Sequence, residues 1–214
     1  IVGKDGMVEW IGHPMGMDKP LEAVLAGSWD RAKAKAAAEA ERALQTFASE
    51  ELSVLLKDAT ATGNWKPMMD RFAALESSNP DPTQVRLLKF QVMATSDRTE
   101  DACATARQLL AAQLDASDLN MIAWSIATDL KGDGRDLKLA LSAAQRAAEL
   151  SKGDPSILDT QARVLFEMGD TAEAAKVQRT AVEGAEKAGM TGRNLDEIKA
   201  ALKRYEEASK AKSG

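Results

Sequence analysis

One histidine and one cysteine are the side chains of this sequence best suited to metal binding or nucleophilic catalysis. A metal site needs several such ligands close together, and a Cys–His nucleophile pair needs its two side chains in contact. His13 lies in a glycine-rich N-terminal region, whereas Cys103 lies far along the chain between Ala102 and Ala104, with no adjacent cation to favour a reactive thiolate. We therefore interpret both residues as structural, and we expect no catalytic residue and no bound metal.

Other patterns that support chemistry are missing from the sequence. The glycines, including those of the turn expected at residues 132 to 134, match neither the GxxxxGK nor the GxGxxG spacing of phosphate-binding loops, so we expect no cofactor. Glu50–Glu51 and Glu206–Glu207 are adjacent pairs. Consecutive helical side chains point about 100° apart, so these carboxylates are expected on the surface and not as proton-sharing pairs. A single cysteine also excludes an internal disulfide and dithiol chemistry in this chain.

The composition limits the class of protein. Hydrophobic residues make up 44% of the 214 residues and charged residues 29%, with a mean hydropathy of -0.31, which is enough apolar surface to offset the ordering entropy of folding. Charged residues interrupt every apolar stretch well before the ~20 residues that a bilayer span needs, so we expect a soluble protein without a membrane span. The net charge of -5 and the pI near 5.1 argue against nucleic acid as a partner.

Glycine and proline crowd the first 27 residues and set this region apart from the body. Two short β-prone runs, residues 1–2 and 7–11, flank Asp5-Gly6, which predicts a β-hairpin with a tight turn. A helix capped by Asp18 should follow and stop at Gly27. An alanine-rich connecting helix is then predicted over residues 30–48.

The body from residue 49 onwards is predicted to consist of four antiparallel helix pairs and a final helix from Asn194. Its strongest signal is an internal repeat of 35 residues, which pairs Ala127 with Ala162, Leu130 with Leu165 and Gly134 with Gly169. After a slip of one residue it also pairs Ala140 with Ala174 and Ala147 with Ala181. Small residues permit two helices to cross closely, and glycine permits the left-handed turn between them.

This arrangement resembles the tetratricopeptide repeat, with "LFEMGDTAEAAKVQRTAVE" at residues 165–183 as the best match and residues 123–150 as the second. The aromatic landmarks of that family are mostly replaced, by Leu158, Leu165 and Gln178. The resemblance implies a right-handed superhelical array whose first helices line a concave groove for a protein or peptide. The residues at its groove positions are Met121, Trp124, Thr128, Ser156, Asp159, Arg163 and Phe166. The alternative for Trp124 is a place in the core between repeats.

The first 30 residues resemble the end of an extracytoplasmic thioredoxin-like (TlpA/redoxin) domain, in "IVGKDGMVEWIGHP" and "MDKPLEAVLAGSWD". In that family the redox dithiol precedes this segment, so no catalytic role transfers to these residues. The resemblance implies a periplasmic or secreted location. Because the sequence begins Ile1-Val2, we also interpret it as a fragment or a processed product.

The sequence therefore predicts a mainly all-α protein with a short N-terminal β-hairpin and helix. The predicted domains are residues 1–29 as the thioredoxin-like remnant, 30–48 as the connecting helix and 49–214 as the repeats with a capping helix. The predicted function is a non-catalytic interaction module that binds a protein or peptide. The alternatives are the C-terminal part of a thiol-disulfide oxidoreductase, and a structural spacer or a homodimer formed through the hairpin.

Overall fold

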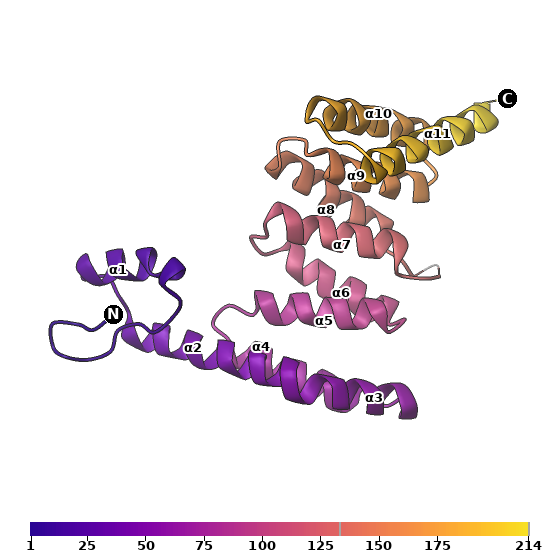
Figure 1. Ribbon diagram of the computed structural model, residues 1–214. Helices are drawn as coiled ribbons and strands as arrows, with labels where there is room; N and C mark the ends of the chain where they lie inside the picture. Colours follow the sequence, from indigo (N-terminus) through magenta and orange to yellow (C-terminus); the bar gives the residue numbers. More distant parts are fainter. Residues whose placement is uncertain (133, 214) are drawn as a thin grey trace. The chain divides into compact units, whose positions relative to one another are not determined.

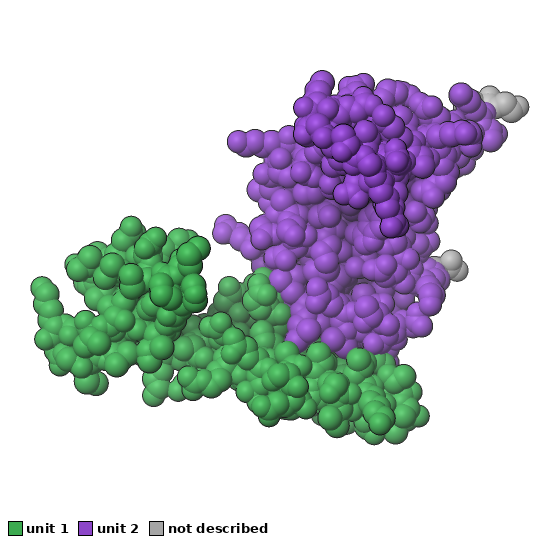
Figure 2. Space-filling model, viewed as in Figure 1, with its two compact units in different colours: residues 1–85 green, residues 86–214 purple. Residues whose placement is uncertain are grey.

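The computed structural model describes residues 1–132 and 134–213, so Asp133 in the turn expected at 132 to 134 lies outside the described residues. The described structure is mainly α-helical, which confirms the predicted class (Figure 1). The chain divides into two compact units, Ile1–Val85 and Arg86–Gly214 (Figure 2). The predicted division at residues 29 and 48 stays a prediction. No helix within the described parts of the chain combines the length and the apolar character needed to cross a bilayer.

The N-terminal residues do not form the predicted β-hairpin. A tight turn is present, with Gly6 at φ +78° and the Asp5 carboxylate accepting a hydrogen bond from Met7 N at 3.0 Å. Between the two predicted strands, however, only an isolated antiparallel bridge joins Val2 and Val8. A two-stranded ribbon is marginal without a third strand or an apolar layer against it. Val2 and Val8 are both exposed, so no such layer covers them, and the local turn signal did not suffice.

Helix α1 (Asp18–Leu25) forms where a helix was predicted, although Asp18 is its first residue and does not cap it. Arg31 attaches the N-terminal region to the start of helix α2 (Arg31–Thr46). Its guanidinium pairs with Asp5 at 2.9 Å and also with Glu9. The Trp29 indole donates a hydrogen bond to the Glu9 carbonyl at 3.1 Å. These polar contacts hold residues 1–31 together without an apolar core beneath them.

A π-helical turn, Phe47–Glu51, joins α2 to helix α3 (Leu52–Thr62) without an interruption of the helical rod. Helix α4 (Lys66–Ser78) packs against both helices. Phe47 is fully buried and meets Phe72 edge-on, with ring centroids 5.1 Å apart. Arg71 Nε pairs with Glu51 Oε2 at 2.7 Å beside these rings. The core of unit 1 therefore forms around the π-helical turn.

The helices of unit 2 follow one another in a stack in Figure 1. They are helix α5 (Thr83–Thr95), which begins three residues before the boundary of the unit, α6 (Thr99–Leu110), α7 (Ala116–Thr128), α8 (Leu137–Leu150), α9 (Pro155–Glu167), α10 (Thr171–Lys187) and α11 (Arg193–Ser213). Each of α7 to α10 packs against the next helix in the chain, and α10 packs against α11. An aspartate caps each of α7 to α10, with Asp115, Asp136, Asp154 and Asp170 accepting hydrogen bonds from first-turn amides. Gly169, at φ +84°, adopts the left-handed turn between α9 and α10.

Many of the buried side chains between these helices are alanines. The repeat alanines that the sequence aligned are almost completely buried, as are their neighbours on the same helix faces; this set comprises Ala123, Ala127, Ala140, Ala144, Ala147, Ala162, Ala174 and Ala181. Side chains of this size let helix axes approach closely and leave no room for a longer chain.

Enlarging one of these alanines should therefore destabilise unit 2. Ala162, which is fully buried against Leu165, Ala174 and Tyr205, is the most direct position to test. We expect Ala162→Leu to lower the free energy of unfolding by about 1–3 kcal/mol, the usual cost of overpacking a close helix contact. Urea denaturation measures this value. Ala172→Leu, at an exposed position of α10, is the matched control and should change little; equal effects of the two substitutions would contradict the close packing.

The N-terminal region should be the least stable part of the chain. Six of its large apolar side chains are exposed: Val2, Met7, Val8, Ile11, Met15 and Leu25. Because none of residues 1–29 is buried, their backbone hydrogen bonds have no core above them, and we expect them to exchange amide hydrogens much faster than α9 and α10 in the isolated chain. Hydrogen exchange followed by mass spectrometry checks this. Protection of residues 1–29 equal to that of α9 and α10 would show that they form a stable structure alone.

Candidate functional site

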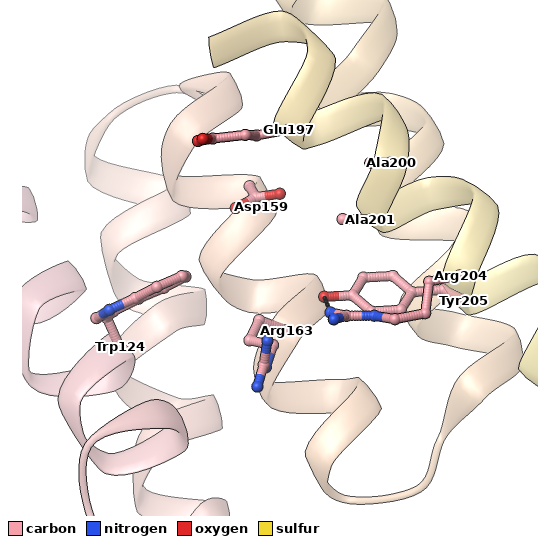
Figure 3. Close-up of a pocket in the computed structure, with 8 residues that line it drawn as sticks. All are labelled: Trp124, Asp159, Arg163, Glu197, Ala200, Ala201, Arg204 and Tyr205. Atoms are coloured by element: carbon pink, nitrogen blue, oxygen red, sulfur yellow. Dashed lines mark hydrogen bonds between the residues drawn. The ribbon is translucent and has the colours of Figure 1, made fainter. Parts of the chain in front are cut away.

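A cavity of about 410 Å³ lies in unit 2 between α7, α9 and α11 (Figure 3). The side chains with chemical character around it are Trp124, Asp159, Arg163, Glu197, Arg204 and Tyr205. On α9 the aspartate and the arginine are four residues apart, and on α11 the glutamate and the arginine are seven residues apart, so each pair shares one helix face. Ala200 and Ala201 lie between the two charged residues of α11, and their small side chains leave space in the cavity on that side.

Trp124 supplies the wall from α7, and its ring extends toward the cavity in Figure 3. Its side chain is 40% exposed, whereas the neighbouring Ala123 and Ala127 are buried in the helix contacts. Residue 124 is rotated about 100° from residue 123 around the helix, which carries the indole out of the packed stripe. A large aromatic side chain is therefore presented to solvent at a cavity.

A buried amide holds Asp159 in place. Gln178 of α10 is fully buried, and its Nε2 donates hydrogen bonds to Asp159 Oδ1 at 2.5 Å and to the Ile198 carbonyl of α11 at 3.0 Å. Burial raises the pKa of Asp159, while the hydrogen bond from Gln178 and the charges of Arg163 and Arg204 act in the opposite direction. The side chain that is hydrogen-bonded to the Asp159 carboxylate is thus a neutral amide and not a cation.

Aromatic rings, not carboxylates, hold Arg204. Its guanidinium carbon lies 5.0 Å from the centroid of Tyr205 and 5.1 Å from that of Phe166, and Nη2 donates a hydrogen bond to the Tyr205 hydroxyl at 3.2 Å. The two rings stack with centroids 4.6 Å apart. Within residues 1–132 and 134–213, no carboxylate lies in ion-pair distance of Arg204. The cation is positioned by cation–π contacts and keeps donors for another group.

Arg163 is tied to its own helix. Its Nη2 pairs with Glu167 Oε1 at 2.9 Å, and Arg135 Nη1 approaches the other oxygen of that carboxylate at 3.5 Å. The Nε of Arg163 is buried and has no hydrogen-bond partner among the described residues. This arginine is thus partly satisfied, with one donor group still without an acceptor.

The structure brings together three of the seven residues at the predicted groove positions, namely Trp124, Asp159 and Arg163. Phe166 lies next to them, partly buried against Tyr205. The remaining three do not line the cavity: Met121 is partly buried, Ser156 is exposed in the first turn of α9, and Thr128 donates a hydrogen bond to the Trp124 carbonyl at 2.9 Å.

Sequence reasoning missed the contribution of α11 to the cavity. The sequence predicts α11 only as a capping helix, and that role assigns nothing to Glu197, Arg204 or Tyr205. The spacing of seven residues between those two charges was visible in the sequence and places them on one face. Which face meets the cavity depends on how α11 packs on α10, and no local pattern carries that information.

The two residues first considered for chemistry lie elsewhere. His13 is exposed, and its Nδ1 accepts a hydrogen bond from Met15 N at 3.3 Å. Cys103 is buried in α6, with its thiol 3.8 Å from the Gly134 carbonyl. In the part of the chain that the structure describes, no three His, Cys, Asp or Glu side chains group closely enough to hold a metal ion.

The raised pKa of Asp159 predicts a specific pH dependence of stability. The folded state holds this proton more tightly than the unfolded chain, so stability from this group falls as pH rises from its unfolded pKa to its higher folded pKa. Asn keeps an acceptor for Gln178 but does not ionise. We expect the melting temperature of Asp159→Asn, minus that of the parent chain, to increase as the pH is raised above about 4. A difference that is constant with pH would refute the shift.

No family model matches the chain, and no match is found among the curated proteins or the solved structures.

Proposed function

We propose that this chain is a non-catalytic interaction module that binds a peptide segment of a partner protein at the cavity between α7, α9 and α11. The observation that carries the proposal is Trp124, a large aromatic side chain left 40% exposed at a cavity that also holds two arginines. Tryptophan and arginine are the residues that most often dominate binding energy at protein interfaces. A cavity with an apolar wall and a few charged groups suits a side chain with its flanking backbone.

The proposal includes a tetratricopeptide-like arrangement of unit 2, in which α7 with α8 and α9 with α10 are repeats and α11 is the cap. Support comes from the buried alanines at the aligned positions and from the glycine turn between α9 and α10. In such an array α7 and α9 are first helices and belong to the concave, right-handed superhelical face. The cavity lies on these two helices.

A second candidate function concerns the N-terminal region. Its exposed apolar side chains are a surface that a further layer would cover. From the resemblance of residues 1–29 to a thioredoxin-like domain, we propose as the second candidate that they belong to an extracytoplasmic thiol-disulfide oxidoreductase. Reduction of insulin disulfides by this chain and by a longer chain that includes the thioredoxin-like part would test this. Activity of the longer chain alone supports the second candidate, whereas turnover by these 214 residues would contradict the non-catalytic proposal.

Trp124→Ala should weaken peptide binding and leave the fold intact. Selection from a displayed library of random peptides provides the probe, and isothermal titration measures the affinity. We expect a loss of about 1–2 kcal/mol, or roughly 5- to 30-fold, with a small change in melting temperature. Leu150→Ala, which removes an exposed apolar side chain of α8 outside the cavity, is the control and should leave affinity unchanged.

The proposal fails if Trp124→Ala leaves peptide affinity unchanged. It also fails if this variant lowers the melting temperature as much as Ala162→Leu does, because Trp124 would then act in the core.

A further inference from the structure

The charges around the cavity are separated into an acidic end and a basic end. In Figure 3 Asp159 and Glu197 lie together at one end, and Arg163 and Arg204 lie at the other. The acidic residue comes first on both helices: Arg163 follows Asp159 by four residues on α9, and Arg204 follows Glu197 by seven on α11. One helical turn of 3.6 residues advances about 5.4 Å, so the acidic and basic residues of each helix lie one turn or more apart along its axis.

One charge at each end lacks a contacting opposite charge. Arg163 pairs with Glu167, and Glu197 pairs with Arg193, each along its own helix. Asp159 contacts the neutral amide of Gln178, and Arg204 contacts aromatic rings. Among the described residues, neither of these two lies within ion-pair distance of an opposite charge. The cavity therefore presents one available anion and one available cation.

From this layout, and resting on the proposed peptide-binding function, we infer that the partner segment carries one basic and one acidic side chain about a helical turn apart. The basic side chain lies at Asp159 and the acidic side chain at Arg204, with the intervening part against Trp124. A segment with only one sign of charge gains at one end and is repelled at the other. A segment with both signs gains at both ends.

The spacing of the two charges follows from backbone geometry. Side chains two residues apart on one face of an extended peptide are separated by about 6.6–6.8 Å along the chain. Side chains four residues apart on a helical peptide are separated by about 6 Å. Both spacings are close to the rise of about 6 Å along α9 from Asp159 to Arg163, and Arg204 lies at the Arg163 end in Figure 3. Lys or Arg with Asp or Glu at either spacing is the expected signature of bound sequences.

The test uses peptides selected from a displayed random library with the complete chain, then synthesised with the basic residue, the acidic residue or both replaced by Gln. We expect either single replacement to weaken binding about tenfold, and the affinity of the unmodified peptide to fall as salt is raised. In double-mutant cycles, Arg204→Gln should couple to the acidic residue of the peptide alone, and Asp159→Asn to its basic residue alone. Lys203→Gln and Glu207→Gln, exposed α11 residues that do not line the cavity, are the matched controls.

The outcomes separate this inference from the function on which it rests. Peptides whose binding depends on Trp124 but is insensitive to both charge replacements and to salt would overturn the inference and leave the peptide-binding function standing. If no peptide binds in a Trp124-dependent way, both fall. Melting temperatures of the Arg204 and Asp159 variants show whether each remains folded, and the salt dependence of the parent chain needs no variant.

Discussion

The close approach of helices at alanine is the constraint on which unit 2 depends. Ala123, Ala127, Ala140, Ala162 and Ala174 are almost completely buried where one helix meets the next. At such contacts a longer side chain would push the axes apart, so large side chains must lie on other faces of the same helices. Trp124 illustrates this. Its neighbours Ala123 and Ile126 are buried, but the rotation of about 100° per residue places Trp124 on the exposed face of α7.

The buried Gln178 connects this packing to the cavity. An apolar side chain at this buried position would fill space without making a directed contact. The amide instead bonds to Asp159 of α9 and to the Ile198 carbonyl of α11. Burying a polar group is costly unless it is hydrogen-bonded. The two bonds of Nε2 offset part of that cost and link three helices, while Oε1 has no hydrogen-bond partner among the described residues. The orientation of the acidic end of the cavity depends on a residue that does not line it.

Features that depend on local periodicity, such as the helices of unit 2, could be predicted from the sequence. Features that depend on packing between distant segments could not. The alanine repeat predicted α7 to α10, because residue size acts within a few residues. Of the two aligned glycines, Gly169 adopts the left-handed turn, whereas before α8 it is Gly132 and not Gly134 that has a positive φ. The predicted hairpin was wrong because the Asp5-Gly6 turn forms without a layer to stabilise the strands beside it. Trp124, Asp159 and Arg163 are among the residues at the predicted groove positions and line the cavity; their role in binding stays a prediction. Arg204 depends on how α11 packs, which amphipathicity alone does not specify.

The π-helical turn at Phe47–Glu51 changes which faces of α2 and α3 are in line. Its hydrogen bonds span five residues instead of four, so the turn takes in more residues than an α-helical turn. The residues after it are therefore rotated around the axis relative to the phase that α2 would have continued. An apolar stripe followed at 3.6-residue spacing from Ala40 through Phe47 loses its phase within this turn, so residues 31–62 form one unbroken rod without one unbroken hydrophobic period.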